Sequence, residues 1–506
     1  MTKLKIWLRL GAIALLYHSC LFAQNITKGP WLADPGKSSI TIRWESDSRG
    51  IFAVAYGTDK SLALEQKARF IEESHSSFLY EKQIEGLEAG QTYFYQVRSK
   101  DQSSLISTFK CAMPKQSPLS FVVMGDSRSN PKIFGAISDQ VNTLYPDLIL
   151  SVGDLVREGG NYEQWDKYYF SVARNVINHI PLISAVGDHE ADNVDGDEAV
   201  LFTHFLFPHK NHLKLWFSFD YGDAHFVALD YRYPYNDEMI EWFRKDMAKS
   251  KARWKFVYTH RPSYNLGGHR STWGRDVWPK LFSQYKVDVV FAGHSHLYER
   301  FYPVRPQSDP DAWAVTYITT GGAGASLYAA AQSPFLAFSK SVNHFVYIRT
   351  DNDSLHLKTF LNDGSILDKV SWGKAKNGPS FTVKSQDELD LIGMFAGAIS
   401  ASLERLPMKE IPAISEITLK PVFVKEDVHF KISLAEESKK AYQMQPVQGT
   451  IKNGRQTQVS LKIYARGTMT VSRWGDIQPA LKLVADYQSK SFHGSVVSKD
   501  VEYRAY

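Results

Sequence analysis

The chain has 506 residues, of which 43% are hydrophobic and 13% aromatic. A chain of this length and composition can hold roughly three folded domains. Its formal net charge is only +5 at pH 7, with 59 basic against 54 acidic residues. A nucleic-acid partner is not indicated, because proteins that bind nucleic acids concentrate basic residues on one face.

The N-terminus predicts an export signal. Three basic residues within the first nine positions precede an apolar stretch at 10–16, and the small residue Ala23 follows. This order is typical of a signal peptide, here residues 1–23, and the apolar run is too short to span a membrane. We expect cleavage near Ala23 and a periplasmic, cell-surface or secreted mature chain without a transmembrane segment. A lipoprotein anchored through Cys20 is the less favoured alternative, because residues 17–19 fit a lipidation site poorly.

Residues 26–114 predict an all-β domain. Ile40, Ile42 and Trp44 alternate with Thr41 and Arg43 in ITIRW at 40–44, and Tyr93, Tyr95 and Val97 alternate with Phe94 and Gln96 in YFYQV at 93–97, as in strands with one buried face. The segment GLEAG at 86–90 supplies a turn between short strands. By itself this pattern indicates a β-sandwich that acts as a spacer.

Residues 115–372 predict an α/β domain. Short apolar runs alternate with segments of helical character, of which 239–250 is one. The runs lie at 121–124, 148–152, 182–186, 225–229, 255–259 and 287–292. Strands without polar alternation are typical of sheets that are covered on both faces.

The remaining region, 373–506, predicts one helix followed by β-structure. SQDE at 385–388 is typical of a capping box, and it precedes thirteen small, apolar residues at 391–403, too few for a membrane span. VHFKIS at 428–433 and QVSLKI at 458–463 alternate as strands do. The sequence predicts no role for this region.

Five polar stretches directly follow apolar strands of the α/β region. They are GDSR at 125–128, GDLV at 153–156, GDHE at 187–190, THRP at 259–262 and GHSH at 293–296. Open sheets bind ligands beyond the carboxyl ends of their strands, so we expect these stretches to converge. Together they supply three carboxylates and three imidazoles, from Asp126, Asp154, Asp188, His260, His294 and His296.

This mixture of donors predicts a metal centre. Carboxylate and imidazole together suit Fe, Zn or Mn better than Mg or Ca. Six donors exceed one tetrahedral site, whereas two metals that share a bridging carboxylate would use them all. Two metals about 3.5–4 Å apart can bind both the attacking and the leaving oxygen of a phosphoryl transfer. A single stretch would indicate only a turn or a structural histidine, and the repetition favours the metal centre.

The order of the motifs resembles the calcineurin-like metallophosphoesterase superfamily. GPWL at 29–32, YGT at 56–58 and the stretch at 86–97 resemble the N-terminal fibronectin-III-like domain of purple acid phosphatases and their bacterial relatives. The stretches at 221–230, 285–300 and 317–324 resemble the catalytic core. The resemblance covers about residues 26–372. It implies a fibronectin-III-like domain at 26–114 and, at 115–372, a β-sandwich core flanked by helices (αββα).

The resemblance also implies roles for single residues. Two metal ions would share Asp154. The other ligands would be Asp126 and His296 for the first metal, and Asp188, His260 and His294 for the second. His189 would steady the transition state or protonate the leaving oxygen. His269 lies where relatives carry a substrate-facing histidine, and a role as an ordinary loop residue is equally open.

Three residues depart from the family's pattern. Arg157 stands where purple acid phosphatases carry the tyrosine of GDxxY, and Arg128 stands where many superfamily members carry the histidine of DxH. Asp188 replaces the usual asparagine, which adds a negative charge. Each arginine could bind a substrate phosphate or neutralise the ligand carboxylates, and both readings stay open.

We therefore expect an exported hydrolase of phosphoric esters that depends on two divalent or trivalent metal ions, with a metal-bound hydroxide as nucleophile. The favoured substrates are small phosphomonoesters. A phosphodiesterase or nucleotide hydrolase of the same fold is the second choice. A degenerate, non-catalytic surface protein whose β domains bind glycan or protein is the third.

Overall fold

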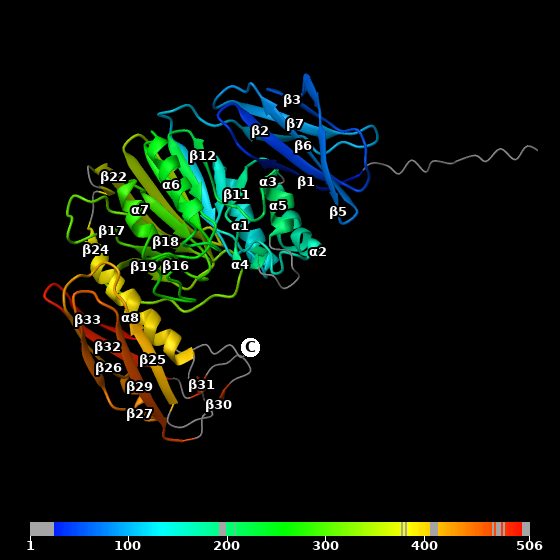
Figure 1. Ribbon diagram of the computed structural model, residues 1–506. Helices are drawn as coiled ribbons and strands as arrows, with labels where there is room; N and C mark the ends of the chain where they lie inside the picture. Colours follow the sequence, from blue (N-terminus) through cyan, green and yellow to red (C-terminus); the bar gives the residue numbers. More distant parts are fainter. Residues whose placement is uncertain are drawn as a thin grey trace, which may run out of the picture.

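The computed structural model describes residues 25–191, 199–207, 209–375, 378–379, 382–404, 413–467, 470–471, 477–478 and 481–497. The expected signal peptide at 1–23 lies outside these residues. Three regions follow one another in space in chain order, with the central one between a β-rich N-terminal and a β-rich C-terminal region (Figure 1). In the described part of the chain, no helix combines the length and the apolar character that a membrane crossing requires.

The N-terminal region consists of two four-stranded sheets around one core. The first sheet has the order β1 (Ile26–Ala33), β2 (Ser39–Ser46), β6 (Ser77–Glu85) and β5 (Arg69–Ser74). The second has the order β4 (Leu64–Lys67), β3 (Ala53–Gly57), β7 (Thr92–Arg98) and β8 (Ser107–Lys110). Trp44 from the first sheet and Tyr95 from the second are both buried in this core. The alternation at 93–97 arises because every second side chain of β7 points into this core.

The central region contains two seven-stranded sheets. The first has the order β11 (Leu182–Ser184), β10 (Leu148–Ser151), β9 (Leu119–Met124), β20 (His344–Thr350), β21 (Ser354–Leu361), β22 (Ile366–Ala375) and β23 (Gly378–Pro379). The second has the order β12 (Phe217–Tyr221), β13 (Ala224–Ala228), β14 (Trp254–Thr259), β15 (Val289–Ala292), β18 (Thr316–Thr320), β16 (Tyr298–Phe301) and β19 (Leu336–Lys340). Phe121 of the first sheet packs edge-on against Phe226 and Phe256 of the second, so the sheets share one aromatic core.

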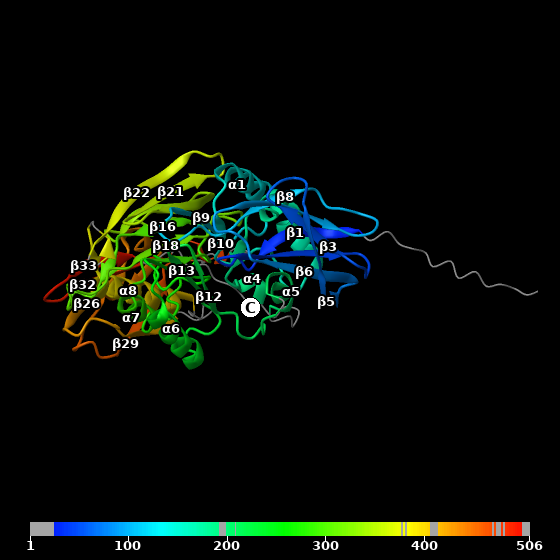
Figure 2. The same ribbon diagram turned by 90° about the horizontal axis from the view of Figure 1, so that it is seen from above.

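Helices cover the outer faces of both sheets. Seen from above, α1 (Pro131–Leu144) lies on one side of the sheets, and α6 (Asp237–Lys249) and α7 (Trp278–Gln284) lie on the other (Figure 2). The strands are buried on both faces, which explains their uninterrupted apolar sequences. The expected αββα class is thereby confirmed. Further short helices are α2 (Tyr162–Trp165), the π-helix η1 (Asp166–Phe170), α3 (Ser171–Ile177), α4 (Asp188–Ala191) and α5 (Val200–Leu206).

Parallel pairing brings the five polar stretches together. Strands β9, β10 and β11 run parallel in the first sheet, and β13, β14, β15 and β18 run parallel in the second. The chain leaves β9, β10, β11, β14 and β15 at their carboxyl ends and enters a polar stretch each time. Because parallel strands end at the same edge, stretches that span 170 residues of sequence meet there.

The C-terminal region begins with α8 (Gln386–Glu404), which the capping-box pattern predicted. Ser385 Oγ accepts a hydrogen bond from Glu388 N at 3.3 Å, as an N-cap does. One sheet has the order β25 (Ala413–Leu419), β29 (Thr457–Ala465) and β27 (Tyr442–Met444). The other has the order β28 (Val447–Ile451), β26 (Val428–Leu434), β32 (Leu483–Gln488) and β33 (His493–Val497). Phe395 of α8 lies in the core of these sheets. Two small pairs, β17 (Val304–Arg305) with β24 (Lys384–Ser385) and β30 (Thr470–Val471) with β31 (Ile477–Gln478), complete the strands.

A buried polar cluster joins the N-terminal sandwich to the central region. Glu45 of β2 is fully buried and pairs with Lys28 at 2.9 Å and with His204 of α5 at 2.9 Å. Tyr162 of α2 donates to the same carboxylate. The second nitrogen of His204 lies 2.6 Å from Glu72. A carboxylate buried this deeply is stable only with such partners, so the cluster fixes how the two regions dock.

Candidate metal centre

The polar stretches contain three ligand-type residues with left-handed backbone. The φ angles of Asp126, Asp154 and His294 are +57°, +60° and +65°. Residues other than glycine rarely adopt this region, although aspartate and histidine tolerate it better than most, and such conformations recur at functional sites. Space is equally restricted, because a Cβ at Gly153 would lie 2.6 Å from the Cα of Gly187. The sharp turns therefore require both the glycines and the strained ligands.

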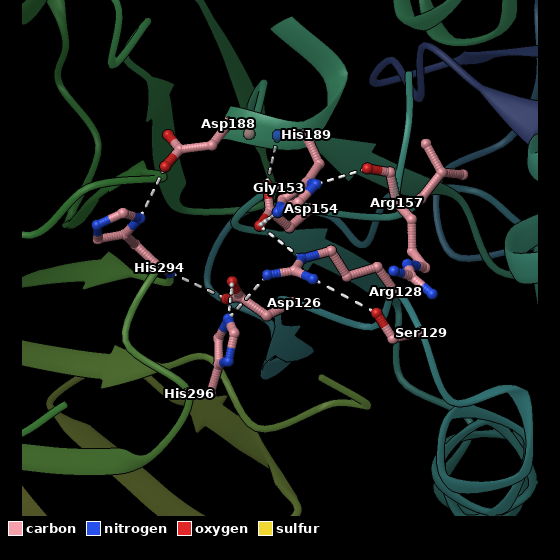
Figure 3. A network of polar contacts seen from close by, with 12 residues as sticks. Asp126, Arg128, Ser129, Gly153, Asp154, Arg157, Asp188, His189, His294 and His296 are labelled. Atoms are coloured by element: carbon pink, nitrogen blue, oxygen red, sulfur yellow. Dashed lines mark hydrogen bonds and ion pairs between the residues drawn. The ribbon is translucent and has the colours of Figure 1, made fainter. Parts of the chain in front are cut away.

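Two groups of three buried side chains result. Each group offers one donor atom per residue, and these atoms lie within 4.8 Å of one another. The first group is Asp126, Asp154 and His296, and the second group is Asp188, His260 and His294. Figure 3 labels all of these residues except His260, and it shows Asp188 beside His294 and Asp126 beside His296. All six sequence-predicted ligands are brought together, with the division into two groups that the family resemblance implied.

In the first group, hydrogen bonds orient the donors. The Nδ1 of His296 donates to the carbonyl oxygen of Ser326 at 2.6 Å, since a carbonyl can only accept. Its Nε2 therefore carries a lone pair, and it lies 3.3 Å from Asp126 Oδ1. Asp126 Oδ2 accepts from the backbone N of His294 at 3.0 Å, whereas Oδ1 is buried without a hydrogen-bond partner. An orphaned buried carboxylate oxygen is expected where a cation belongs.

The second group repeats this arrangement. The Nδ1 of His260 donates to the carbonyl of Val152 at 2.8 Å, so Nε2 is the nitrogen that faces the carboxylates. That Nε2 is buried without a hydrogen-bond partner, 3.4 Å from Asp154 Oδ1 and 3.6 Å from Asp188 Oδ1. Asp188 Oδ2 lies 2.9 Å from His294 Nδ1. Asp154 thus faces both groups, as a bridging carboxylate must.

The charges of the centre are strongly coupled. Burial opposes ionisation of Asp154, yet His260, His189 and Arg128 outweigh it and hold the pKa of Asp154 at about 2. Burial alone would lower the pKa of His260, but the surrounding aspartates, Asp154 first, raise it to about 9. Anionic carboxylates beside imidazoles in a dry site form the donor set that Fe, Zn and Mn prefer. The residues present therefore fit two metal ions.

A glutamate that the sequence reasoning left without a role braces the centre. Glu190 is 1% exposed and accepts hydrogen bonds from four backbone N–H groups, those of Asp154, Leu155, Val156 and Gly187, at 2.7–3.2 Å. Burial and the charge of Asp154 raise the pKa of Glu190 to about 8. Glu190 holds the strained turn at Asp154, and its place beside His189 in GDHE was the only hint in the sequence.

Two further residues were missed. Arg261, which follows His260, binds both oxygens of Asp188 at 3.0 and 2.9 Å and so balances the charge that Asp188 adds. The ring of Tyr328 stacks on that of His296 with a centroid distance of 4.4 Å. Tyr328 lies in a loop with no motif, so nothing in the sequence indicates it.

The two predicted catalytic histidines lie beside the groups. The backbone N of His189 donates to Asp154 Oδ1 at 3.0 Å, and its ring Nδ1 donates to the carbonyl of Arg157 at 2.6 Å. Its Nε2 then lies 3.8 Å from Asp154 Oδ2, and the side chain is 30% exposed. The ring of His269 stacks on that of His294, with centroids 4.3 Å apart. His269 is therefore close to the second group even though it belongs to a loop.

The two arginines are placed differently. Arg128 points into the centre, where its Nε donates to Asp154 Oδ2 at 3.0 Å (Figure 3). Arg157 contributes its carbonyl to His189, but its side chain is exposed and turns away from the carboxylates (Figure 3). Among the described residues Arg157 makes no ion pair with a carboxylate. Of the two, only Arg128 neutralises a predicted ligand.

Comparisons with known proteins agree with this geometry. Residues 119–298 match the calcineurin-like phosphoesterase family. Purple acid phosphatase 21 of Arabidopsis thaliana is 26% identical over 368 residues, which cover 67% of this chain and 82% of the relative. From the same plant, probable inactive purple acid phosphatase 24 is 29% identical and covers 37% of this chain and 35% of its own length. Fe(3+)-Zn(2+) purple acid phosphatase 12 of Arabidopsis thaliana is 29% identical, and the match covers 50% of this chain and 60% of that relative.

The fold is also similar to that of a solved purple acid phosphatase from yellow lupin (Lupinus luteus) seeds. The TM-score is 0.60 at 20% sequence identity, and the match covers 71% of this chain and 74% of that chain. At this identity the likeness concerns the fold. The family match and the relatives support two metal ions for a chain that has two groups of candidate ligands.

Proposed function

We propose that this chain, whose residues 119–298 match the calcineurin-like phosphoesterase family and which is similar to purple acid phosphatases, hydrolyses phosphoric monoesters of small molecules. The position of Asp154 carries the proposal. One of its oxygens lies 3.4 Å from His260 of the second group, and the other faces the side of Arg128 and the first group. A shared carboxylate between two donor sets is the arrangement that positions two metal ions on one phosphate.

In this proposal the six donors keep the roles that the resemblance implied. Asp154 would be shared by both ions. The first ion would be held by Asp126 and His296 as well, and the second by Asp188, His260 and His294. When bound, the two ions supply Lewis acidity and lower the pKa of water at the site. Carbonyl partners fix the rings of His260 and His296, so each presents its Nε2 without reorganisation.

His189 is the proposed proton donor. Its Nδ1 is held by the Arg157 carbonyl, so a second proton on the ring must sit on Nε2, the nitrogen nearest Asp154. The protonated ring then donates from Nε2 to the leaving oxygen of the ester. His269 approaches from the side of His294 and would contact the substrate. The exposed guanidinium of Arg157 can reach out to the substrate's phosphate, for which its planar donors are suited.

A paired assay tests the reaction. The purified mature chain, loaded with Mn²⁺ or Zn²⁺, is given p-nitrophenyl phosphate and, separately, bis-p-nitrophenyl phosphate. The proposal expects the monoester to turn over with the higher kcat/KM. Faster turnover of the diester would replace the monoesterase by a phosphodiesterase of the same centre. Asp154→Asn serves as the control for contaminating phosphatases, because it removes the bridging charge with little change of shape.

A non-catalytic binding protein is the second candidate, and one observation favours it. Arg128 stands where many superfamily members have a histidine ligand, and it contacts two donors of the first group. One relative is itself named as a probable inactive phosphatase. In that case neither ester would be hydrolysed under any metal loading, while the fold stayed intact by circular dichroism.

The same proposal includes export and three folded regions. Cleavage near Ala23 would leave a fibronectin-III-like domain at 26–114, a metallophosphoesterase domain at 115–372 and a C-terminal domain at 373–506, whose β-sheets could contact the cell surface or glycans. Intact-mass measurement of the protein from an extracellular or periplasmic fraction tests cleavage. A mass that retains residues 1–23 would contradict it.

A further inference from the structure

An arginine side chain contacts each of the two groups of candidate ligands, and the two arginines do so differently. In the first group, Arg128 reaches two of the three donors, with Nε 3.0 Å from Asp154 Oδ2 and Nη2 3.4 Å from His296 Nε2. Its side chain is only 16% exposed, so it lies within the centre. The guanidinium thus spans a carboxylate and an imidazole that are both candidate ligands of one metal ion.

Arg128 contacts the very atoms that a first metal ion needs. Since Nδ1 of His296 donates to Ser326, its one lone pair is on Nε2, and an arginine nitrogen can only donate to it. Asp154 Oδ1 accepts from the His189 backbone and faces His260, so Oδ2 is the oxygen left for the first group. The single lone pair of His296 Nε2 cannot serve Arg128 and a metal at the same time, whereas Asp154 Oδ2 would have to share its two lone pairs between them.

The second group keeps one of its two imidazoles, that of His260, available, whereas His294 Nδ1 lies 2.9 Å from Asp188. Arg261 binds Asp188, but that contact is to a carboxylate, whose two oxygens offer about four lone pairs and can serve a cation as well. The side chain of Arg261 is 42% exposed, so solvent screens its charge. The Nε2 of His260 is fully buried and has no hydrogen-bond partner. A metal ion at this group would therefore displace no hydrogen bond of His260 Nε2.

We infer that the two metal sites are unequal, with a tight site at the second group and a weak site at the first, and that Arg128 sets this difference by competing for Asp154 and His296. The inference rests on the proposed two-metal centre. For the first ion to bind, Arg128 must withdraw from both donors, and it must do so against the repulsion between its charge and the ion. Because of Arg128, the second group would hold its ion tightly, and the first group would bind an ion only at higher metal concentration.

Metal counting tests this directly. The mature full-length chain is stripped with a chelator, titrated with Mn²⁺ by calorimetry, and passed through a desalting column before its manganese is measured. We expect about one retained Mn²⁺ per wild-type chain and a second, weaker binding event. Arg128→Met, which removes the charge at similar length, should tighten the weak site by about 10–100-fold, the range typical of residues that contact metal ligands. Arg128→His, which supplies the DxH donor, should retain two ions.

A matched control tests whether the contact of Arg128 with the ligands matters, or only the loss of one positive charge. Arg157→Met removes the same charge from a nearby exposed arginine that makes no ion pair with a carboxylate among the described residues. It should retain the wild-type count. Two equally tight Mn²⁺ ions in the wild type would overturn the inference, and so would an Arg157→Met variant that gains the second ion as Arg128→Met does. Arg128 variants that retain one ion while their thermal midpoints stay near wild type would overturn it as well.

The outcome does not depend on hydrolysis. If no variant cleaves p-nitrophenyl phosphate but the manganese counts change as expected, the proposed function fails and the inequality of the sites stands. If the wild type hydrolyses the ester with two equally tight ions, the function stands and the inference falls. In the manganese-loaded Arg128→His variant, electron paramagnetic resonance should also show spin-coupled Mn²⁺ pairs at one equivalent of added metal per site.

Discussion

Glu190→Gln is expected to destabilise the protein and its metal centre together. Oε1 of Glu190 accepts from Leu155 and Val156, and Oε2 accepts from Asp154 and Gly187. A glutamine keeps one oxygen, so its NH₂ group must face two buried N–H donors. The pKa of Glu190 is about 8, so the side chain is anionic above this pH. Hydrogen bonds to a charged group contribute about 1.5–3 kcal/mol each, so the loss of two at pH 9 amounts to about 3–6 kcal/mol. That is a large part of a typical stability of about 5–15 kcal/mol.

Chemical denaturation at pH 9, where Glu190 is ionised, measures this loss with and without Mn²⁺. Glu163→Gln is the matched control, because it makes the same change on an exposed residue of α2. We expect Glu163→Gln to behave as wild type and Glu190→Gln to lose stability and bind metal more weakly at both groups, since the turn at Asp154 serves both. If Glu190→Gln kept the wild-type free energy of unfolding and metal affinity, Glu190 would not act as an anionic brace.

The other predictions concern single side chains. Asp154→Ala should abolish hydrolysis and reduce the metal content, as measured by elemental analysis, because it removes the shared ligand. His189→Ala should keep the metals and lower kcat by about 10²–10⁴-fold, the usual contribution of a general acid; an unchanged kcat would exclude this role. Arg157→Ala should raise KM with unchanged metal content, and a loss of metal would instead show that it steadies a ligand. His204 pairs with two glutamates that raise its pKa against the effect of burial. A histidine whose pKa is higher in the folded than in the unfolded state stabilises the fold fully at pH values below its unfolded pKa of about 6.5. This stabilisation is lost as the pH rises through the folded-state pKa. The difference in thermal midpoint between wild type and His204→Gln should therefore be largest near pH 6 and shrink at higher pH.

Local pattern was sufficient for much of the fold. Apolar runs without alternation predicted strands that are buried on both faces. The strands β9, β10, β13, β14 and β15 lie at these runs. The period of two in QVSLKI predicted β29, and the capping pattern predicted the start of α8. These succeeded because strand burial and helix caps depend on neighbouring residues, which are read directly from the chain.

The candidate ligands were also predictable, since each follows a strand of a parallel sheet and such strands end at one edge. The residues that hydrogen-bond to these ligands or stack on them could not be predicted from the sequence. Arg261 and Glu190 stand beside predicted residues, but only the folded turns show that one holds Asp188 and the other holds the backbone of Asp154. Tyr328 reaches His296 from a loop 32 residues away.

The sequence by itself determined the class of fold, the strand-end positions of six donors and the type of metal that they suit. It left two readings for each arginine, because a guanidinium binds a carboxylate and a phosphate equally well. Tertiary structure decided only where the two arginines lie. The backbone at 126–128 turns Arg128 inward to Asp154 and His296, whereas the turn at 153–157 leaves Arg157 exposed. The direction in which each arginine side chain points depends on how the strained turns pack against strands from distant parts of the chain. That information is present only in the folded molecule.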